Sequence, residues 1–216
     1  MAQSAPSEPA STRVEPFADR LLDIVVEVGP LEIRAWERDR LELVNPGQES
    51  GAPGPRLILL EDIVRLVGSV SPGSKALLMV PAGAPLRVSL VTGTLELKGL
   101  AGRIDARVRD GALIASDWRG EGSLETASGE LHVELAELTP GRAVKLRSYT
   151  GNITVRLPSA PTSGRVLAVS LAGRVQVPAR FQLRGGRLYE AVFGAGDPVV
   201  SVDTVRGNVI VTMGER

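Results

Sequence analysis

The stretch VTGTLELKGLAGRIDARVRDGALIASDWRGEGSLETASGELHV, residues Val91–Val133, carries a glycine at every ninth position. Most of these glycines begin the pattern Gly-x-apolar-x-apolar, which returns later in the chain. Glycine takes positive φ without steric cost and successive strand residues face opposite sides, so each unit predicts a turn and a short strand. The turn glycines predicted in this way are Gly93, Gly102, Gly111, Gly120, Gly129, Gly151, Gly164, Gly173 and Gly207.

A fixed short period is typical of a stacked repeat architecture. One unit accommodates a strand and its corner, so two units predict one coil of roughly 18–22 residues with about two strands. Successive coils would then pair as parallel strands ~4.8 Å apart. The fold class predicted is therefore all-β, a parallel β-solenoid. Its core is expected to be aliphatic, because aromatic residues make up only 3% of the chain.

The remainder of the chain is organised around these repeats. Residues 1–18, rich in Ser, Pro, Ala and Glu, predict a disordered tail. Residues 19–85 predict N-terminal strands that form the first coils, and residues 86–213 the regular repeats, with a longer segment at 178–198. Residues 56–70 suit two strands or one short helix, and their β-branched residues favour strands. The last repeat leaves little chain to cap the stack, which predicts open ends that invite association.

Charged residues are expected on the outside of the coils, where neighbouring coils carry opposite signs. Each such pair contributes roughly 0.2–1 kcal/mol and helps to set the register. The 25 basic and 25 acidic residues cancel, so no field attracts a nucleic acid or an anionic membrane. The predicted ladders place Arg103, Arg107 and Arg109 beside Glu121 and Glu125, these beside Arg142, Lys145 and Arg147, and Glu130 and Glu134 beside Arg156.

Residues that could carry catalysis or bind a metal are few. The chain has no cysteine, which excludes disulfides and thiolate zinc sites. Its only histidine, His132, lies between Glu130 and Glu134, but alternate side chains of a strand stand ~7 Å apart, too wide for one zinc ion. No nucleophile elbow, phosphate-binding loop or dinucleotide fingerprint occurs. We therefore predict no cofactor, no metal, no catalytic residue and no enzymatic activity.

Aromatic residues provide two further candidates. Trp36 and Trp118 could stack on a carbohydrate, although Trp118, two residues before Gly120, better suits a corner-filling role. The segment 178–198 combines aromatic and basic residues and is either a binding loop or, as we favour, a wider coil or plug over the end of the core. Its candidate interaction residues are Phe181, Arg184, Arg187, Tyr189 and Phe193.

The units VSLVTGTLELKGL, LETASGELHV and LRSYTGNITV resemble the T-x-S-G-D-I-x-V repeats of the bacterial putative-adhesin β-solenoid proteins. The segments ALLMVPAGAPLRV and GAGDPVVSVDTVRGNVIV fit the layout of that family as well, and the resemblance covers about Leu22–Met213. It implies a surface role for a domain of unknown function and supplies no catalytic residues. The chain departs from the pattern by carrying Arg or Asn after several of the glycines, and by lacking a signal and an anchor.

The leading functional prediction is a non-catalytic structural or binding module that acts through protein–protein or surface contacts. One alternative is a self-assembling scaffold similar to the bactofilins, and another is a carbohydrate-binding or carbohydrate-active β-helix protein. The expected partner is a protein or a second copy bound at the ends of the stack, with no nucleic acid; the sequence does not show whether a small molecule is bound. No secretory signal and no apolar window of ~18 residues occur, which predicts a cytoplasmic location, or attachment to a membrane through a partner.

Overall fold

The computed structural model describes residues 11–14, 20–44, 54–70 and 74–214. These residues form nineteen strands and no helix, so the all-β prediction is confirmed. The pairing is mostly parallel, with several antiparallel pairs. Residues 56–70 form strands, as favoured above, rather than a helix.

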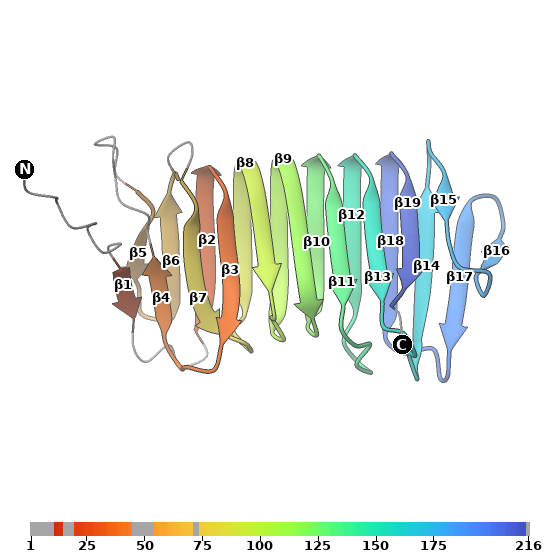
Figure 1. Cartoon of the computed structure of the whole chain (residues 1–216), viewed down its shortest axis with the longest axis horizontal. Coiled ribbons are helices and arrows are strands. Elements are labelled where there is room, and N and C mark those ends of the chain that lie inside the picture. The colour runs from red at the N-terminus through yellow and green to blue at the C-terminus, as the bar shows by residue number, and fades with distance from the viewer. Residues whose placement is uncertain (1–10, 15–19, 45–53, 71–73, 215–216) are drawn as a thin grey trace, which may run out of the picture.

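The strands pair in two rows along the long axis of the molecule (Figure 1). The long strands β8 and β9 contribute their first halves to the first row and their second halves to the second row. The first row contains, in spatial order, β5 (Arg56–Leu59), β6 (Ile63–Gly68), β2 (Leu21–Val28), β8 (Leu86–Lys98), β9 (Arg103–Trp118), β10 (Glu121–Ser128), β12 (Val144–Thr150), β18 (Val199–Arg206), β14 (Gly164–Ser170), β17 (Leu188–Phe193) and β16 (Gln182–Arg184). The second row contains β1 (Ser11–Val14), β4 (Leu41–Val44), β7 (Ala76–Pro81), β3 (Leu31–Trp36), β8, β9, β11 (Leu131–Leu135), β13 (Ile153–Leu157), β19 (Val209–Met213) and β15 (Val175–Gln176).

The core is an aliphatic column between the two rows. Alternation along each strand turns every second side chain inwards, and parallel register stacks these side chains on one another. The predicted inward residues Ile104, Ala106 and Val108 are all buried. One complete ladder of the first row, with every member at most 2% exposed, consists of Ile24, Val88, Ala106, Leu124, Leu146, Val202 and Ala168.

Glycines form a continuous column at the corner where the first row turns into the second. A Cβ placed on Gly111, Gly129 or Gly151 would collide with the carbonyl oxygen of the preceding glycine in the column, and all three residues have positive φ. The backbones therefore approach too closely at this corner for any side chain. In spatial order the column consists of Gly29, Gly93, Gly111, Gly129, Gly151, Gly207 and Gly173.

The other predicted turn glycines lie outside this column. Gly102 and Gly120 stack on each other at the opposite corner, without positive φ. Gly164 begins β14 with φ 139°, and a Cβ there would lie 2.8 Å from the side chain of Leu138.

Spatial order departs from chain order at both ends of the stack. Strands β2 and β3 lie between β6–β7 and β8, while β18 and β19 lie between β12–β13 and β14–β15. The expectation that the last repeat forms an open end is therefore wrong, because β18 is paired on both sides. Beyond β14 the first row is instead extended by the antiparallel strands β17 and β16 (Figure 1).

Paired asparagines join the inserted strands to their neighbours. The backbone N–H of Asn208 donates to the Oδ1 of Asn152 at 2.9 Å, and the Oδ1 of Asn208 accepts from the N–H of Arg174 at 2.9 Å. The dipeptide Gly-Asn, which occurs at Gly151 and again at Gly207, was a sequence signal that these two turns are neighbours.

At the N-terminal end, β1 pairs antiparallel with β4. The expectation of a disordered tail over residues 1–18 is therefore wrong for Ser11–Val14. The rest of that range lies outside the described residues.

Candidate interaction surface

Charge ladders cross the outer face of the first row, as predicted. The guanidinium of Arg107 lies 2.8 Å from the Glu125 carboxylate on the next strand, and the two residues are 18 positions apart in sequence. Arg147, which is in register with Glu125, binds Asp203 at 2.8 Å, and this contact raises its pKa. On the second row, Arg156 lies 3.8 Å from Glu134. The separation of Arg107 from Glu125 equals two of the nine-residue units found in the sequence.

Three arginines of the predicted ladders behave differently. Arg142 lies in the loop before β12, where its guanidinium donates to the backbone carbonyls of Ala101 and Arg119. Arg109 pairs with the adjacent Asp110, and Arg103 with Asp105 on its own strand. The expectation that Arg142 and Arg109 form ion pairs with acidic residues of the neighbouring strand is wrong. Arg142 instead binds two backbone carbonyls, and Arg109 binds the residue next to it in sequence.

We expect Arg107→Ala to lower the free energy of unfolding by less than about 1 kcal/mol, because exposed ion pairs are screened by water. The Arg107 side chain is 72% exposed. Urea denaturation measures the change, with Arg87→Ala as the control on the neighbouring strand. A loss above about 2 kcal/mol would contradict the interpretation of these ladders as solvated pairs.

Beyond β12 the outer face of the first row becomes apolar. Tyr149 is 62% exposed and Leu171 60%, while Val192 and Val199 are exposed by 49% and 37%. At the position where β9 and β10 carry Arg107 and Glu125, β18 carries Asp203, but β14 carries the aliphatic residue Val169. Contiguous exposed apolar groups are uncommon on monomeric proteins and mark contact sites. The apolar patch consists of Tyr149, Leu167, Val169, Leu171, Leu188, Val192, Val199 and Val205.

Charges beside the apolar patch are neutralised within the chain. The Glu190 carboxylate lies between two guanidiniums, at 3.5 Å from Arg165 and 2.9 Å from Arg184. Arg187 donates to the backbone carbonyl of Leu171. The patch is thus bordered by fixed, balanced charges.

The predicted segment 178–198 forms part of this end of the molecule. Phe181 and Phe193 are buried, and Tyr189 packs partly buried against the core. The guanidinium of Arg180 lies 4.4 Å from the centre of the Phe193 ring. The aromatic side chains therefore face the core, and the exposed groups nearby are Leu183 and Val192.

Sequence reasoning missed Tyr149 and Leu171 as surface residues. Each lies two positions before a corner glycine, in SYTG and SLAG, and alternates with a buried serine. The signal was therefore present, since an apolar residue occupied an outward position in both repeats.

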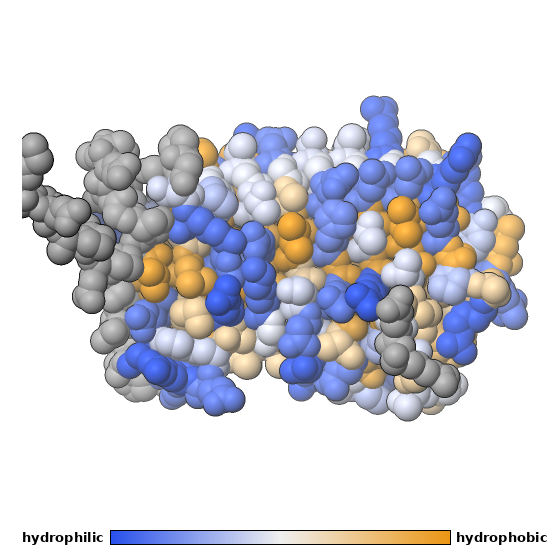
Figure 2. Space-filling model, in the orientation of Figure 1, coloured by the Kyte–Doolittle hydropathy of each residue, from blue (hydrophilic) through white to orange (hydrophobic). Residues whose placement is uncertain are grey.

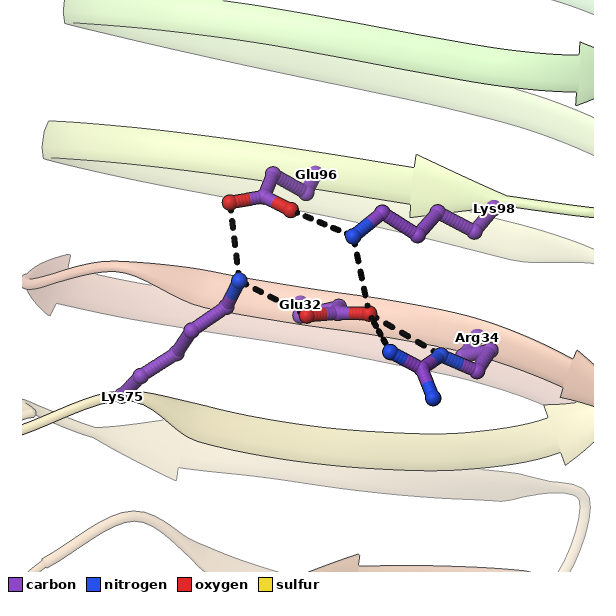
Figure 3. Close-up of polar contacts among 5 residues, drawn as sticks. All are labelled: Glu32, Arg34, Lys75, Glu96 and Lys98. Carbon is purple, nitrogen blue, oxygen red and sulfur yellow. Dashed lines mark hydrogen bonds and ion pairs between the residues drawn. The ribbon is translucent and has the colours of Figure 1, made fainter.

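A separate ion cluster joins three strands of the second row (Figure 3). Lys75 binds Glu32 at 2.7 Å and Glu96 at 2.8 Å, while Lys98 binds Glu96 at 2.7 Å and Glu32 at 3.1 Å. Arg34 adds a contact to Glu32 at 2.5 Å. These five residues come from β3, β8 and the residue before β7, so the ion cluster fastens three neighbouring strands together.

The protonation states in the ion cluster are fixed. Burial alone would raise the pKa of Glu32, but hydrogen bonds from Lys75, Arg34 and Lys98 outweigh it and lower that pKa to about 2. Hydrogen bonds from the two lysines also lower the pKa of Glu96, and the two carboxylates raise the pKa of both lysines. No group here changes charge near neutral pH, as a general acid or base would need to do.

Two shallow grooves adjoin each other on the first row, with volumes of about 270 and 430 Å³. Both are lined by Asp105 and Ser123. Burial would raise the pKa of Asp105, yet hydrogen bonds from Arg103 and Ser123 outweigh this and lower it. Asp105 therefore stays ionised, like the carboxylates of the ion cluster.

The remaining candidates are placed as follows. His132 Nε2 lies 2.9 Å from Glu130, whereas Glu134 contacts Arg156. No group of three metal-binding side chains occurs among the described residues. Trp118 is 1% exposed and fills a corner, as predicted.

The guanidiniums of Arg38 and Arg40 lie over the Trp36 ring, at 5.2 and 5.1 Å from its centre. The ring therefore already contacts cationic side chains of the same chain. Figure 2 shows one face of the molecule on which hydrophilic residues extend along most of the length, with hydrophobic residues in separate groups between them.

The described residues thus define an all-β protein of mostly parallel strands. Its fold is similar to a solved structure described as a putative cell adhesion protein from Clostridium sporogenes, with a TM-score of 0.59 and 17% sequence identity. The match covers 96% of this chain and 100% of the other. At that identity the likeness shows the fold alone. No family model and no curated protein matches the chain.

A search for membrane-crossing helices in the described part of the chain found none of sufficient length and apolar character.

Proposed function

We propose that the chain is a parallel β-solenoid that serves as a non-catalytic binding module and contacts a protein partner through the apolar patch. The observation that carries the proposal is the exposure of Tyr149 and Leu171, 62% and 60%, on a face otherwise made of neutralised charges. Parallel pairing at 18-residue steps from β8 to β10 supports the solenoid description. The cell adhesion description of the similar structure agrees with a contact role and supplies no residues.

The patch suits a protein surface because it is rigid and uncharged. Its residues lie on paired strands, except Leu171, whose backbone N–H donates to the carbonyl of Thr204, so little conformational entropy is lost when a partner binds. Tyrosine provides a large apolar area with a polar end and is enriched in protein interfaces. The balanced charges around Glu190 favour a partner with an apolar centre and a mixed polar rim over a strongly anionic one.

A non-catalytic role is supported by the charge states of the described clusters. The carboxylates of Glu32, Glu96 and Asp105 have lowered pKa values, and the lysines that bind the first two have raised ones. None of these groups is poised to exchange a proton at neutral pH. We keep the cytoplasm as the expected location, with attachment to a membrane through a partner as the alternative.

Photo-crosslinking from position 149 tests the proposal. A photoreactive phenylalanine analogue at Tyr149 is expected to capture a protein partner in the native host, because this side chain is 62% exposed at the patch. The same analogue at Glu134, an exposed position of the second row, is the control. Equal capture from both positions would contradict a binding site at the patch.

A substitution at Tyr149 then measures how much this side chain contributes to the affinity for the partner. With the captured partner purified, Tyr149→Ser is expected to weaken binding at least tenfold, as truncation of an energetically important aromatic interface residue does. Circular dichroism checks that the variant keeps its strands. An unchanged dissociation constant would place the contact elsewhere.

A further inference from the structure

The N-terminal end of the first row is an unpaired strand edge. Within the described part of the chain, β5 pairs with β6 on one side and with no strand on the other. The N–H of Leu60 donates to the carbonyl of Ile63 at 2.9 Å. Because hydrogen-bonded residues alternate in an antiparallel ladder, the N–H and C=O groups of Leu57 and Leu59 point away from β6. These four groups are a template for another strand.

The side chains of this edge are apolar and exposed. Ile58, Leu59 and Leu60 are three consecutive residues with exposures of 36%, 57% and 44%. Leu57 and Leu59 lie opposite Leu66 and Val64, both fully buried, so their side of β5 continues the face of the core. The core is therefore left partly uncovered at this end.

The opposite end of the first row is protected. Strand β16 has only three residues, and its Arg184 is held by Glu190. A turn containing Gly185 and Gly186 follows it. Short length and charge are the usual means by which natural proteins block edge-to-edge pairing. The only charged residue of β5 is Arg56, which stands at the first position of the strand, before the apolar run.

We propose that β5 pairs with β5 of a second copy of this chain, antiparallel across a two-fold axis at Ile58. In this arrangement Leu57 of each copy exchanges hydrogen bonds with Leu59 of the other. The N–H and C=O groups of both residues, which point away from β6, then all have partners. The polarity of the edge fits such a pair, because Arg56 precedes the apolar run and Glu61 and Asp62 follow it. Antiparallel pairing brings these opposite charges towards each other, and the two core faces become continuous.

The same geometry predicts that assembly stops at two. A two-fold interface uses the same surface on both partners and leaves no copy of it free. Growth into a filament would need a second open edge at the other end, where β16 is short and charged. The proposal is independent of the binding role of the apolar patch, which lies at the opposite end of the first row (Figure 1).

Mass in solution is the first test. At tens of micromolar, light scattering is expected to give about twice the 22.8 kDa of the single chain. Leu59→Lys should give the monomer, because it places a charge where the two cores meet. Leu183→Lys, on β16 at 55% exposure, is the matched control and should remain a dimer. A monomeric native chain, a dimer that survives Leu59→Lys, or a longer assembly would each overturn the proposal.

Crosslinking tests the register. The chain has no cysteine, so a single introduced thiol reports only on its own position. At the axis, two copies of residue 58 form a non-hydrogen-bonded pair with Cα atoms about 4.5 Å apart, within the range that a disulfide spans. Ile58→Cys should form a covalent dimer under mild oxidation, while Leu183→Cys should not. Equal crosslinking of the two variants would overturn the antiparallel pairing.

Discussion

Gly129→Ala is expected to lower the free energy of unfolding by more than about 3 kcal/mol, since backbone strain and a steric clash add at this position. Gly129 has φ 138°, where a side chain is strained, and its added Cβ would collide with the carbonyl oxygen of Gly111. The neighbouring strands cannot move apart to relieve the clash without breaking the parallel pairing of β10 with β9 and β12. Denaturant unfolding at neutral pH measures the loss.

Substitutions of two other glycines distinguish the cost of backbone strain from the cost of the steric clash. Gly141 has φ 78° with no atom within 4 Å of its added Cβ, so Gly141→Ala should cost only about 1–2 kcal/mol. Gly83 has neither positive φ nor a neighbour, so Gly83→Ala should change stability by less than about 1 kcal/mol. A loss at Gly129 no greater than at Gly141 would show that the close approach of the coils is unimportant.

Glu32→Gln is expected to lower the free energy of unfolding by about 2–3 kcal/mol at pH 7, somewhat less than for removing one member of a fully buried pair. The Glu32 side chain is only 6% exposed and binds Lys75, Lys98 and Arg34. The amide cannot balance their charges, and Glu96 alone then faces both lysines. Urea denaturation of both proteins gives the difference.

The difference between the two proteins should depend on pH in a defined direction. The pKa of Glu32 is lowered from 4.5 to about 2, so its contribution is fully present above about pH 5 and is lost as the pH falls towards 2. The native chain and Glu32→Gln should therefore converge in acid. Glu27→Gln, at an exposed residue of β2, is the control and should show little difference at any pH. A difference that is constant from pH 7 to pH 3 would contradict the role of the ionised carboxylate.

The middle of the molecule was the most predictable part. A nine-residue period fixes both the turn position and the inward face, so Ile104, Ala106 and Val108 could be placed in the core from the sequence alone. The same period places Arg107 beside Glu125, because two units separate them. A local sequence pattern is sufficient to predict the structure wherever strands that are consecutive in sequence are also adjacent in space.

The ends could not be predicted in the same way. The insertion of β2–β3 and of β18–β19 depends on which strands fit together after long connections, and repeat spacing does not encode that order. The ion cluster was missed for this reason, since Glu32 meets Lys75 and Glu96 only when β3 lies between β7 and β8. The exposed edge at Leu59 depends equally on the outermost place of β5 in the first row.

The inserted position of β18 and β19 has a consequence for biosynthesis. Strands β14 to β17 emerge earlier, yet β14 gains its parallel neighbour only when β18 arrives, because β18 separates it from β12. This half of the molecule therefore cannot assemble progressively as it leaves the ribosome, because an inner strand is synthesised after the strands that lie outside it. Chain termination before β18 would remove that inner strand and leave β14 without its parallel neighbour.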